Sequence, residues 1–282
     1  MGSEPHIRNI SDTARWVAVY RARETERPDA VFRDPFARRL AGERGERIAA
    51  SIPFAEKNSW PFVARTWLVD KLIDDQVRQG TDMVVNLAAG LDARPYRMDL
   101  PRALQWIEVD LPEIFAHKEE LLRNEKPVCQ LERVRLDLSN ASARRELFSQ
   151  VGERAKRVLI LTEGLLIYLS DEEVRELAKD LAAPASFQRW IVDLGSPALL
   201  QMLARKMGAP LDQAGAPLKF APQDGPDFFA RCGWKPEEIH STIHAAAKLR
   251  RLPLFLRLIA KISSPRFQAG RPWSAVCLLA KG

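Results

Sequence analysis

The sequence lacks the long apolar stretch that a membrane-spanning helix needs, since no uncharged apolar run approaches 18 residues. Its first residues, MGSEPHIRNISDTARW, contain acidic side chains and no apolar segment, which is unlike a secretory signal. Cysteine is scarce: Cys129, Cys232 and Cys277 are odd in number and far apart, which argues against a disulfide framework or a zinc site. These absences predict a cytoplasmic protein, in a reducing compartment, without a transmembrane segment.

Phosphate-binding motifs are missing too. The chain contains neither the G-x-x-x-x-G-K-[ST] sequence nor the G-x-G-x-x-G sequence of dinucleotide-binding folds. Histidine, with four residues, offers one metal-like spacing, between His240 and His244, and no third ligand is evident. A metal site is therefore not expected, and a pyrophosphate-binding fold is disfavoured.

Composition indicates a globular protein with a substantial core. The 282 residues are 46% apolar and 28% charged, and no internal repeat or low-complexity linker divides them, so a single domain over residues 1–282 is predicted. The net charge of +6 is unevenly spread, because eight cations and no acid follow Glu238. Such a segment suits an anionic substrate, a nucleic acid or a membrane surface. We favour a simpler interpretation of residues 248–267, an amphipathic lid helix with its cations outward.

The distribution of apolar residues predicts a doubly wound α/β fold. Helical spacing over 11–28, 34–50 and 59–79 predicts an N-terminal helical cap within residues 1–80. Apolar runs then alternate with helical segments, which is typical of a mostly parallel sheet covered on both faces. A cofactor-binding core is assigned to 81–196, and lid elements with a final antiparallel edge strand to 197–282. The predicted strands are 83–89, 105–110, 131–137, 157–162, 189–194 and 274–280, and the predicted helices between them are 112–124, 139–150, 171–183 and 196–207.

In such sheets, ligands bind beyond the carboxyl ends of the strands. Gly90 follows the first strand and Asp110 ends the second, 20 residues later, a spacing that brings a carboxylate within reach of a ribose diol. Asp137 ends the third strand and Glu163 follows the fourth. An adenosine-containing cofactor is therefore indicated, although Asp110 also stands where a helix N-cap would, before Pro112.

Charge indicates which cofactor this is. Asp92 lies two residues after the single glycine of the turn, where its carboxylate would repel a phosphate. S-Adenosylmethionine carries no phosphate, and its sulfonium and ammonium groups tolerate acidic neighbours. We therefore favour S-adenosylmethionine, with S-adenosylhomocysteine as its product, over the dinucleotide of a dehydrogenase.

Several stretches carry a family resemblance when they are taken in order. They are DPFARRL, VARTWLVDKLI, VVNLAAGLDARPYRM, WIEVDLPEIFAHKEELL, LDLSN, LILTEGLLIYLSDEEV and RPWSAVCLLAKG. Over residues 11–282 the chain resembles the leucine carboxyl methyltransferase family, and more closely its bacterial branch of S-adenosylmethionine-dependent methyltransferases, which includes polyketide O-methyltransferases. The resemblance implies a class I methyltransferase with a Rossmann-like, mostly parallel seven-stranded sheet, an antiparallel last strand and an N-terminal helical cap.

The resemblance also implies the cofactor contacts. Arg65 would hold the carboxylate of S-adenosylmethionine, Glu163 would face its ammonium group, and Gly90 would let the methionine portion pass close to the backbone. A second basic contact to that carboxylate would come from Arg21 or Arg23. The other implied contacts are Asp110 at the ribose, Asp137 and Leu138 at the adenine, and Tyr168 in the methyl-transfer pocket.

Structural interpretations stay open for these residues. Arg65 would also suit a solvated helix face and Tyr168 would also suit core packing, while Asp92 and Arg94 either brace the following helix or belong to the site. The chain departs from the eukaryotic members at one point, because Ala88 stands where they carry the first glycine of Gly-Ala-Gly. An alanine there predicts an ordinary negative φ.

The expected reaction is an in-line displacement, to which the enzyme contributes mainly by positioning the reactants. No histidine lies in a matched motif, which favours an acceptor oxygen that ionises without a base, a carboxylate or an acidic phenol. The sequence thus predicts O-methylation of a small, polyketide-like molecule rather than a nucleic acid, with Arg15 or a cation of the C-terminal segment holding the acceptor. Methylation of tRNA or of a protein carboxylate, and cofactor binding without turnover, stay open. The oligomeric state is not predicted.

Overall fold

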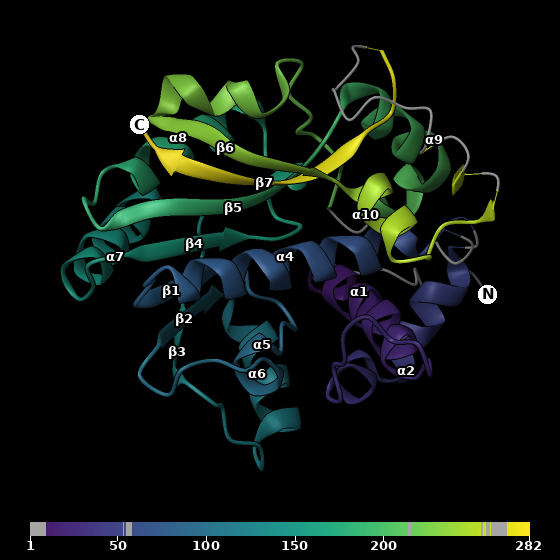
Figure 1. The fold of residues 1–282 in the computed structure, drawn as a ribbon, viewed down its shortest axis with the longest axis horizontal. Coiled ribbons are helices and arrows are strands. Elements are labelled where there is room, and N and C mark those ends of the chain that lie inside the picture. Colours follow the sequence, from purple (N-terminus) through teal and green to yellow (C-terminus); the bar gives the residue numbers. More distant parts are fainter. Residues whose placement is uncertain are drawn as a thin grey trace.

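A central sheet with helices on both faces dominates the computed structural model (Figure 1), which describes residues 10–52, 54, 58–213, 216–254, 256, 257, 260 and 270–282. Much of the lid helix predicted over 248–267 lies outside the described residues and stays a prediction, but its described beginning is wrong, because a helix ends at Lys248 and residues 249–253 are not helical. Within the described residues, no helix combines the length and the apolar character needed to cross a bilayer.

The sheet has seven strands in the order β3-β2-β1-β4-β5-β7-β6. The first five in the chain are parallel: β1 Met83–Leu87, β2 Gln105–Asp110, β3 Gln130–Arg135, β4 Val158–Thr162 and β5 Phe187–Gly195. β7 Ser274–Lys281 runs antiparallel between β5 and β6 Trp234–Ser241. The mostly parallel sheet with an antiparallel last strand is therefore confirmed.

The predicted edge position of the last strand is wrong, because β6 occupies that edge. β6 was missed because its sequence, WKPEEIHS, includes a proline and several charges, and it alternates buried with exposed residues instead of forming an apolar run. These are the properties of an edge strand, which is exposed on one side and excludes a proline only where its N–H must pair.

Period-two alternation divides the strand side chains between the two faces. Met83, Val85 and Leu87 of β1 pack on the face covered by α7 Ala141–Glu153, α8 Asp171–Ala182 and the 3₁₀ helix η2 Gly225–Cys232. Val84 packs on the opposite face with α4 Trp60–Arg78 and α10 Thr242–Lys248. The predicted helix over 59–79 thus covers the sheet directly (Figure 1).

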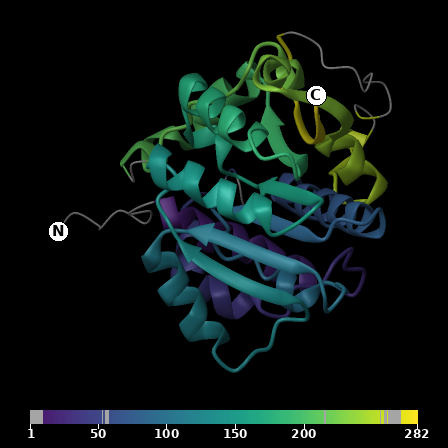
Figure 2. The ribbon, with the colours of Figure 1, turned by 90° about the vertical axis from the view of Figure 1, so that its left-hand side faces the viewer.

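The other two N-terminal helices, α1 Ile10–Thr25 and α2 Ala37–Ser51, pack on each other. Their shared cluster includes Trp16, Tyr20 and Ile48, and it receives Leu211 from α9 Pro197–Gln213. Figure 1 places these helices beyond the end towards which β4 points. Figure 2 shows the halves of the sheet from the side, with the teal β2–β3 half below and the green and yellow C-terminal elements above.

Short elements complete the carboxyl edge of the sheet. α5 Arg94–Arg97 follows β1, α6 Pro112–Leu122 follows β2, and the 3₁₀ helix η1 Leu166–Tyr168 follows β4. Register aligns the strand ends, since Leu87 lies opposite Val109 of β2 and Thr162 of β4. The residues that follow these three strands therefore meet at one edge.

Candidate cofactor and acceptor site

A cavity of about 650 Å³ opens at the carboxyl edge of the sheet, between the strand ends, α1, α4 and α9. Its volume lies within the range of about 300–1,000 Å³ that is usual for small-molecule sites. The structure brings most of the predicted site residues into its lining: Arg65, Gly90, Asp110, Asp137, Leu138, Glu163 and Tyr168. Arg23 is not among the lining residues; it pairs with Glu46 at 2.9 Å, whereas the alternative, Arg21, lines the cavity.

The turn after β1 has an unusual backbone. Gly90 has φ +52°, and a Cβ placed on it would come within 3.2 Å of the Ala14 methyl on α1, so the position favours glycine. The expected negative φ at Ala88 is wrong, because Ala88 has φ +50°. The turn therefore keeps the left-handed backbone of a glycine-rich loop even where the glycine has been replaced, at a cost of about 1–2 kcal/mol.

Replacing Ala88 with glycine is expected to raise the free energy of unfolding by about 0.5–1 kcal/mol, because relief of the left-handed strain exceeds the added entropy of the unfolded chain. Urea unfolding would measure the change. Ala89→Gly is the matched control, since Ala89 has no positive φ and is buried, so it should lower stability by about 1 kcal/mol. Destabilisation by both substitutions would contradict the assignment of strain to Ala88.

Asp110 lies beside this turn and braces it. Its Oδ2 accepts the Gly90 N–H at 2.6 Å, and its Oδ1 accepts the Leu111 N–H at 2.7 Å. Burial raises the pKa of Asp110, despite the two backbone N–H groups, which lower it. An ionised carboxylate has about four acceptor sites, so about two remain for hydroxyl donors in the cavity.

Asp137 and Leu138 form the next part of the lining, after β3. The exposed Asp137 accepts the Ser139 N–H at 2.9 Å through Oδ1. The Leu138 carbonyl accepts Nη1 of Arg144 at 2.7 Å, while its side chain packs against the core. This edge of the cavity thus offers one free carboxylate oxygen and an apolar surface.

Glu163, which follows β4, lies between two arginines. Its Oε1 accepts Nε of Arg65 at 3.0 Å, and its Oε2 pairs with Nη2 of Arg94 at 2.8 Å. Burial opposes its ionisation, but Arg94 and Arg65 outweigh burial and hold the pKa of Glu163 below its usual value. Glu163 is therefore a fixed negative charge and a weak base.

Arg94 connects that carboxylate to a wider buried network. Its side chain is 3% exposed, and it also binds Asp70 of α4 at 2.6 Å and Asp92 at 2.8 Å. Burial would raise the pKa of Asp92, but the charges of Arg94, Lys118 and Arg97 outweigh burial and lower this pKa to about 2. Asp92 and Arg94 therefore serve both interpretations left open by the sequence, because both line the cavity and both brace the chain around it.

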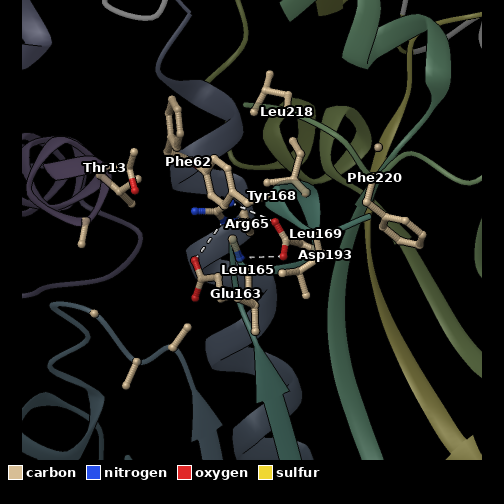
Figure 3. Close-up of a pocket in the computed structure, with 18 of the residues that line it drawn as sticks. Thr13, Phe62, Arg65, Glu163, Leu165, Tyr168, Leu169, Asp193, Leu218 and Phe220 are labelled. Atoms are coloured by element: carbon tan, nitrogen blue, oxygen red, sulfur yellow. Dashed lines mark hydrogen bonds and ion pairs between the residues drawn. The ribbon is translucent and has the colours of Figure 1, made fainter. Parts of the chain in front are cut away.

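Asp193 was not among the site residues predicted from the sequence. This residue of β5 binds Nη1 of Arg65 at 2.9 Å through Oδ2 and accepts the Gly164 N–H at 2.8 Å through Oδ1 (Figure 3). Thr162 of β4 lies opposite Val192 of β5, so Glu163 and Asp193 are neighbours across the sheet. The available signal was an acid in the strand RWIVDL, one residue from its predicted end.

Tyr168 lies between the charged side chains of Arg65, Glu163 and Asp193 and the apolar side chain of Leu218 (Figure 3). Burial raises the pKa of its hydroxyl, which Thr13 of α1 offsets only in part by hydrogen bonding. Tyr168 is thus protonated at neutral pH. The apolar part of the cavity lining, which we call the apolar chamber, comprises Phe54, Phe62, Leu199, Met202, Leu203, Leu211, Leu218 and Phe220.

In the part of the chain that the structure describes, the cations that were expected to hold an acceptor lie outside the cavity lining. Arg15 is 2.7 Å from Nε2 of His117 and does not line the cavity. Arg251, from the basic C-terminal segment, binds the buried Glu24 at 2.7 Å. Among the described residues, the cavity lining contains no lysine and no histidine.

The chain is similar to known proteins. The sequence profile of the leucine carboxyl methyltransferase family matches residues 14–182. A protein of Streptomyces avermitilis, named as a putative S-adenosyl-L-methionine-dependent methyltransferase, is 31% identical over 246 residues, which cover 83% of this chain and 86% of that protein. A protein of Parafrankia sp. with the same designation is 30% identical over 267 residues, 89% of this chain and 85% of its own.

Among solved structures, a DUF574 family protein from Streptomyces avermitilis superposes with a TM-score of 0.62 at 11% identity, covering 94% of this chain and 97% of that one. This similarity supports the fold alone. The profile match and the two relatives show that the chain belongs to the leucine carboxyl methyltransferase family.

Proposed function

We propose that this enzyme transfers a methyl group to an acidic oxygen, a phenolate or a carboxylate, of a small and largely apolar molecule. The coarser activity follows from the family: the protein is an S-adenosylmethionine-dependent methyltransferase. In this proposal residues 1–282 act as one domain, in which 81–196 bind the cofactor while 1–80 and 197–282 close over the acceptor.

The donor set of the cavity fits the cofactor. Arg65 offers a guanidinium to its carboxylate, Glu163 a fixed negative charge to its ammonium group, and Asp110 two remaining acceptor sites to its ribose. Asp137 and Leu138 offer an acceptor and an apolar surface to the adenine, and Gly90 keeps the nearby backbone clear of a side chain. When bound, S-adenosylmethionine supplies an electrophilic methyl group on a sulfonium.

The apolar chamber carries the proposal for the acceptor. Leucine and phenylalanine side chains line it and exclude water, so they favour a molecule with a large apolar surface. The described lining holds no histidine or lysine, Arg65 pairs with both Glu163 and Asp193, and the pKa of Glu163 is lowered. We therefore expect an acceptor oxygen that is already ionised near neutral pH, and the protonated Tyr168 is placed to donate a hydrogen bond rather than to accept a proton.

Incubation with methyl-tritiated S-adenosylmethionine and matched aromatic phenols, carboxylates, alcohols and amines tests the proposal. Label should enter phenols and carboxylates, and the rate should rise with pH through the pKa of each phenol. Labelling of amines or aliphatic alcohols in preference would contradict it. Labelling of tRNA or of a protein carboxylate, with none of the small molecules modified, would contradict it as well.

Filling the chamber should separate acceptor binding from cofactor binding. Leu218 lies above Tyr168 and away from Glu163 (Figure 3), so Leu218→Trp is expected to raise the KM for the acceptor by about tenfold or more while the cofactor Kd stays within about twofold. The same substitution at Leu254, which is 77% exposed, should change neither constant. An unchanged acceptor KM in Leu218→Trp would place the acceptor elsewhere.

A further inference from the structure

Asp193 occupies a position from which it holds two parts of the site at once. It lies near the end of β5, between β4 and β7 in the sheet, so its backbone is fixed on both sides. Side chains two residues apart in a strand lie on the same face of the sheet. Ile191 belongs to the core cluster on the face covered by α4, so the side chain of Asp193 lies on that face too. The side chain therefore meets Arg65, which projects from α4 (Figure 3).

The two oxygens of Asp193 have different partners. Oδ1 accepts the N–H of Gly164, and Oδ2 accepts Nη1 of Arg65. Gly164 has φ +69°, and a Cβ on it would come within 3.5 Å of that same Nη1. The turn after β4 and the guanidinium are thus packed against each other, and one carboxylate sets the position of both.

Asp193 and Glu163, the two carboxylates that pair with Arg65, differ in the number of arginines that each one pairs with. Glu163 divides its oxygens between Arg65 and Arg94. Among the ion pairs of the described residues, Asp193 takes part only in the pair with Arg65. Burial would lower the pKa of Arg65. The charge of Asp193 and, to a smaller extent, that of Glu163 outweigh burial, so the pKa of Arg65 is raised.

We propose that Asp193 is a positioning residue, which holds Arg65 and the Glu163–Gly164 turn in the arrangement that receives the amino-acid end of the cofactor. Asp193 acts through Arg65 rather than by contact with the reacting atoms. Because Arg65 enters the proposed function as the partner of the cofactor carboxylate, the inference rests on that function.

Asp193→Asn separates the two tasks of the side chain. The amide oxygen still accepts the Gly164 N–H, whereas the amide nitrogen is a donor and cannot accept from Arg65. The turn after β4 should therefore keep its conformation, whereas Arg65 loses the acceptor that fixes its position. The matched control is Glu24→Gln, because Glu24 likewise accepts one backbone N–H, from Val31, and hydrogen bonds from an arginine, Arg251, outside the cavity lining, although Arg27 is a second and more distant ion-pair partner at 3.9 Å.

Binding of S-adenosylmethionine and of its decarboxylated analogue, measured by titration calorimetry without acceptor, tests the inference. Asp193→Asn is expected to weaken S-adenosylmethionine by about tenfold or more and the decarboxylated analogue by less than about threefold. The selective loss is expected because only the first ligand carries the carboxylate that Arg65 would bind. A purely structural role would weaken both ligands equally, and Glu24→Gln should leave both affinities within about twofold.

A double-mutant cycle provides a second test of whether Asp193 acts through Arg65. In an Arg65→Gln background, adding Asp193→Asn should change the S-adenosylmethionine affinity by less than about twofold, because the intermediary is already gone. Equal losses for the two ligands in Asp193→Asn, or additive losses in the cycle, would overturn the role of Asp193 while leaving the proposed function intact. Failure of the unaltered protein to bind S-adenosylmethionine would overturn both.

Discussion

Replacing Arg94 with methionine is expected to lower the free energy of unfolding by about 3–5 kcal/mol at neutral pH, because the change removes the arginine that pairs with the buried Asp92 and leaves Asp70 and Glu163 with one arginine each, Arg97 and Arg65. The Arg94 side chain is 3% exposed and pairs with Asp70, Asp92 and Glu163. Methionine preserves much of the side-chain volume, so the expected loss arises from charge rather than from a cavity. Urea unfolding of the purified variant would measure it.

The cost of Arg94→Met should depend on pH. In the unaltered protein the pKa values of Asp92 and Glu163 are lowered, so their contribution to stability is present above the unfolded value of about 4 and is lost as the pH falls. Without Arg94, less positive charge opposes the burial of Asp92 and Glu163, so their pKa values rise. The variant therefore loses stability as the pH rises and these buried carboxyl groups ionise. The difference in unfolding free energy between the two proteins should therefore narrow from about pH 7 to about pH 4.5.

A surface arginine of α4 provides the control for this substitution. Arg78 pairs with Asp74, but its side chain is 70% exposed, so Arg78→Met should change stability by no more than about 0.5 kcal/mol at either pH. If Arg94→Met proved equally neutral, or if its cost did not vary with pH, the carboxylates would not depend on Arg94 for their charge.

The parallel half of the fold could be predicted because its signals are local and consistent. Runs such as MVVNL and VLILT are wholly buried, and buried parallel strands select continuous apolar sequence. β6 escaped prediction for the opposite reason, since a half-exposed edge strand has charges and a proline in place of an apolar run. The turn at Ala88 escaped it because residue preference indicates a negative φ, whereas the surrounding loop imposes φ +50°.

The candidate site could be predicted as far as strand ends and family motifs determine it. Asp110 and Glu163 line the cavity because Asp110 ends one strand and Glu163 follows another, and both strand ends are visible in the sequence. Asp193 could not be found in that way, since its role depends on the register between β4 and β5 and on the approach of α4, which are long-range contacts. Arg94 likewise became interpretable only once the fold brought Asp70 and Glu163 to it.

The second large effect is expected in Asp110→Ala, which should weaken S-adenosylmethionine binding by at least about tenfold. Each hydrogen bond between a hydroxyl and an ionised carboxylate contributes about 1.5–3 kcal/mol, and about 1.4 kcal/mol corresponds to a tenfold change in affinity. Titration calorimetry would measure the change. An analogue of S-adenosylhomocysteine that lacks both ribose hydroxyls should bind the variant and the unaltered protein equally, because it has nothing to donate to Asp110.

The binding role of Asp110 has to be separated from its bracing of the turn through the Gly90 and Leu111 N–H groups. Asp82 provides the control, since its carboxylate likewise accepts two backbone N–H groups, from Lys156 at 3.0 Å and Arg157 at 2.9 Å, at the other end of the sheet. Asp82→Ala should lower stability and leave cofactor affinity unchanged.

The pH dependence of binding gives a second measure of the same carboxylate. Burial raises the pKa of Asp110, so cofactor affinity should fall as the pH is lowered towards that value, at a higher pH than for an ordinary aspartate with a pKa of about 3.9. Hydroxyl donors favour the ionised form, which fixes this direction. Asp110→Asn should remove the dependence. A pH-independent affinity in the unaltered protein, together with unchanged binding in Asp110→Ala, would show that Asp110 braces the turn without touching the ribose.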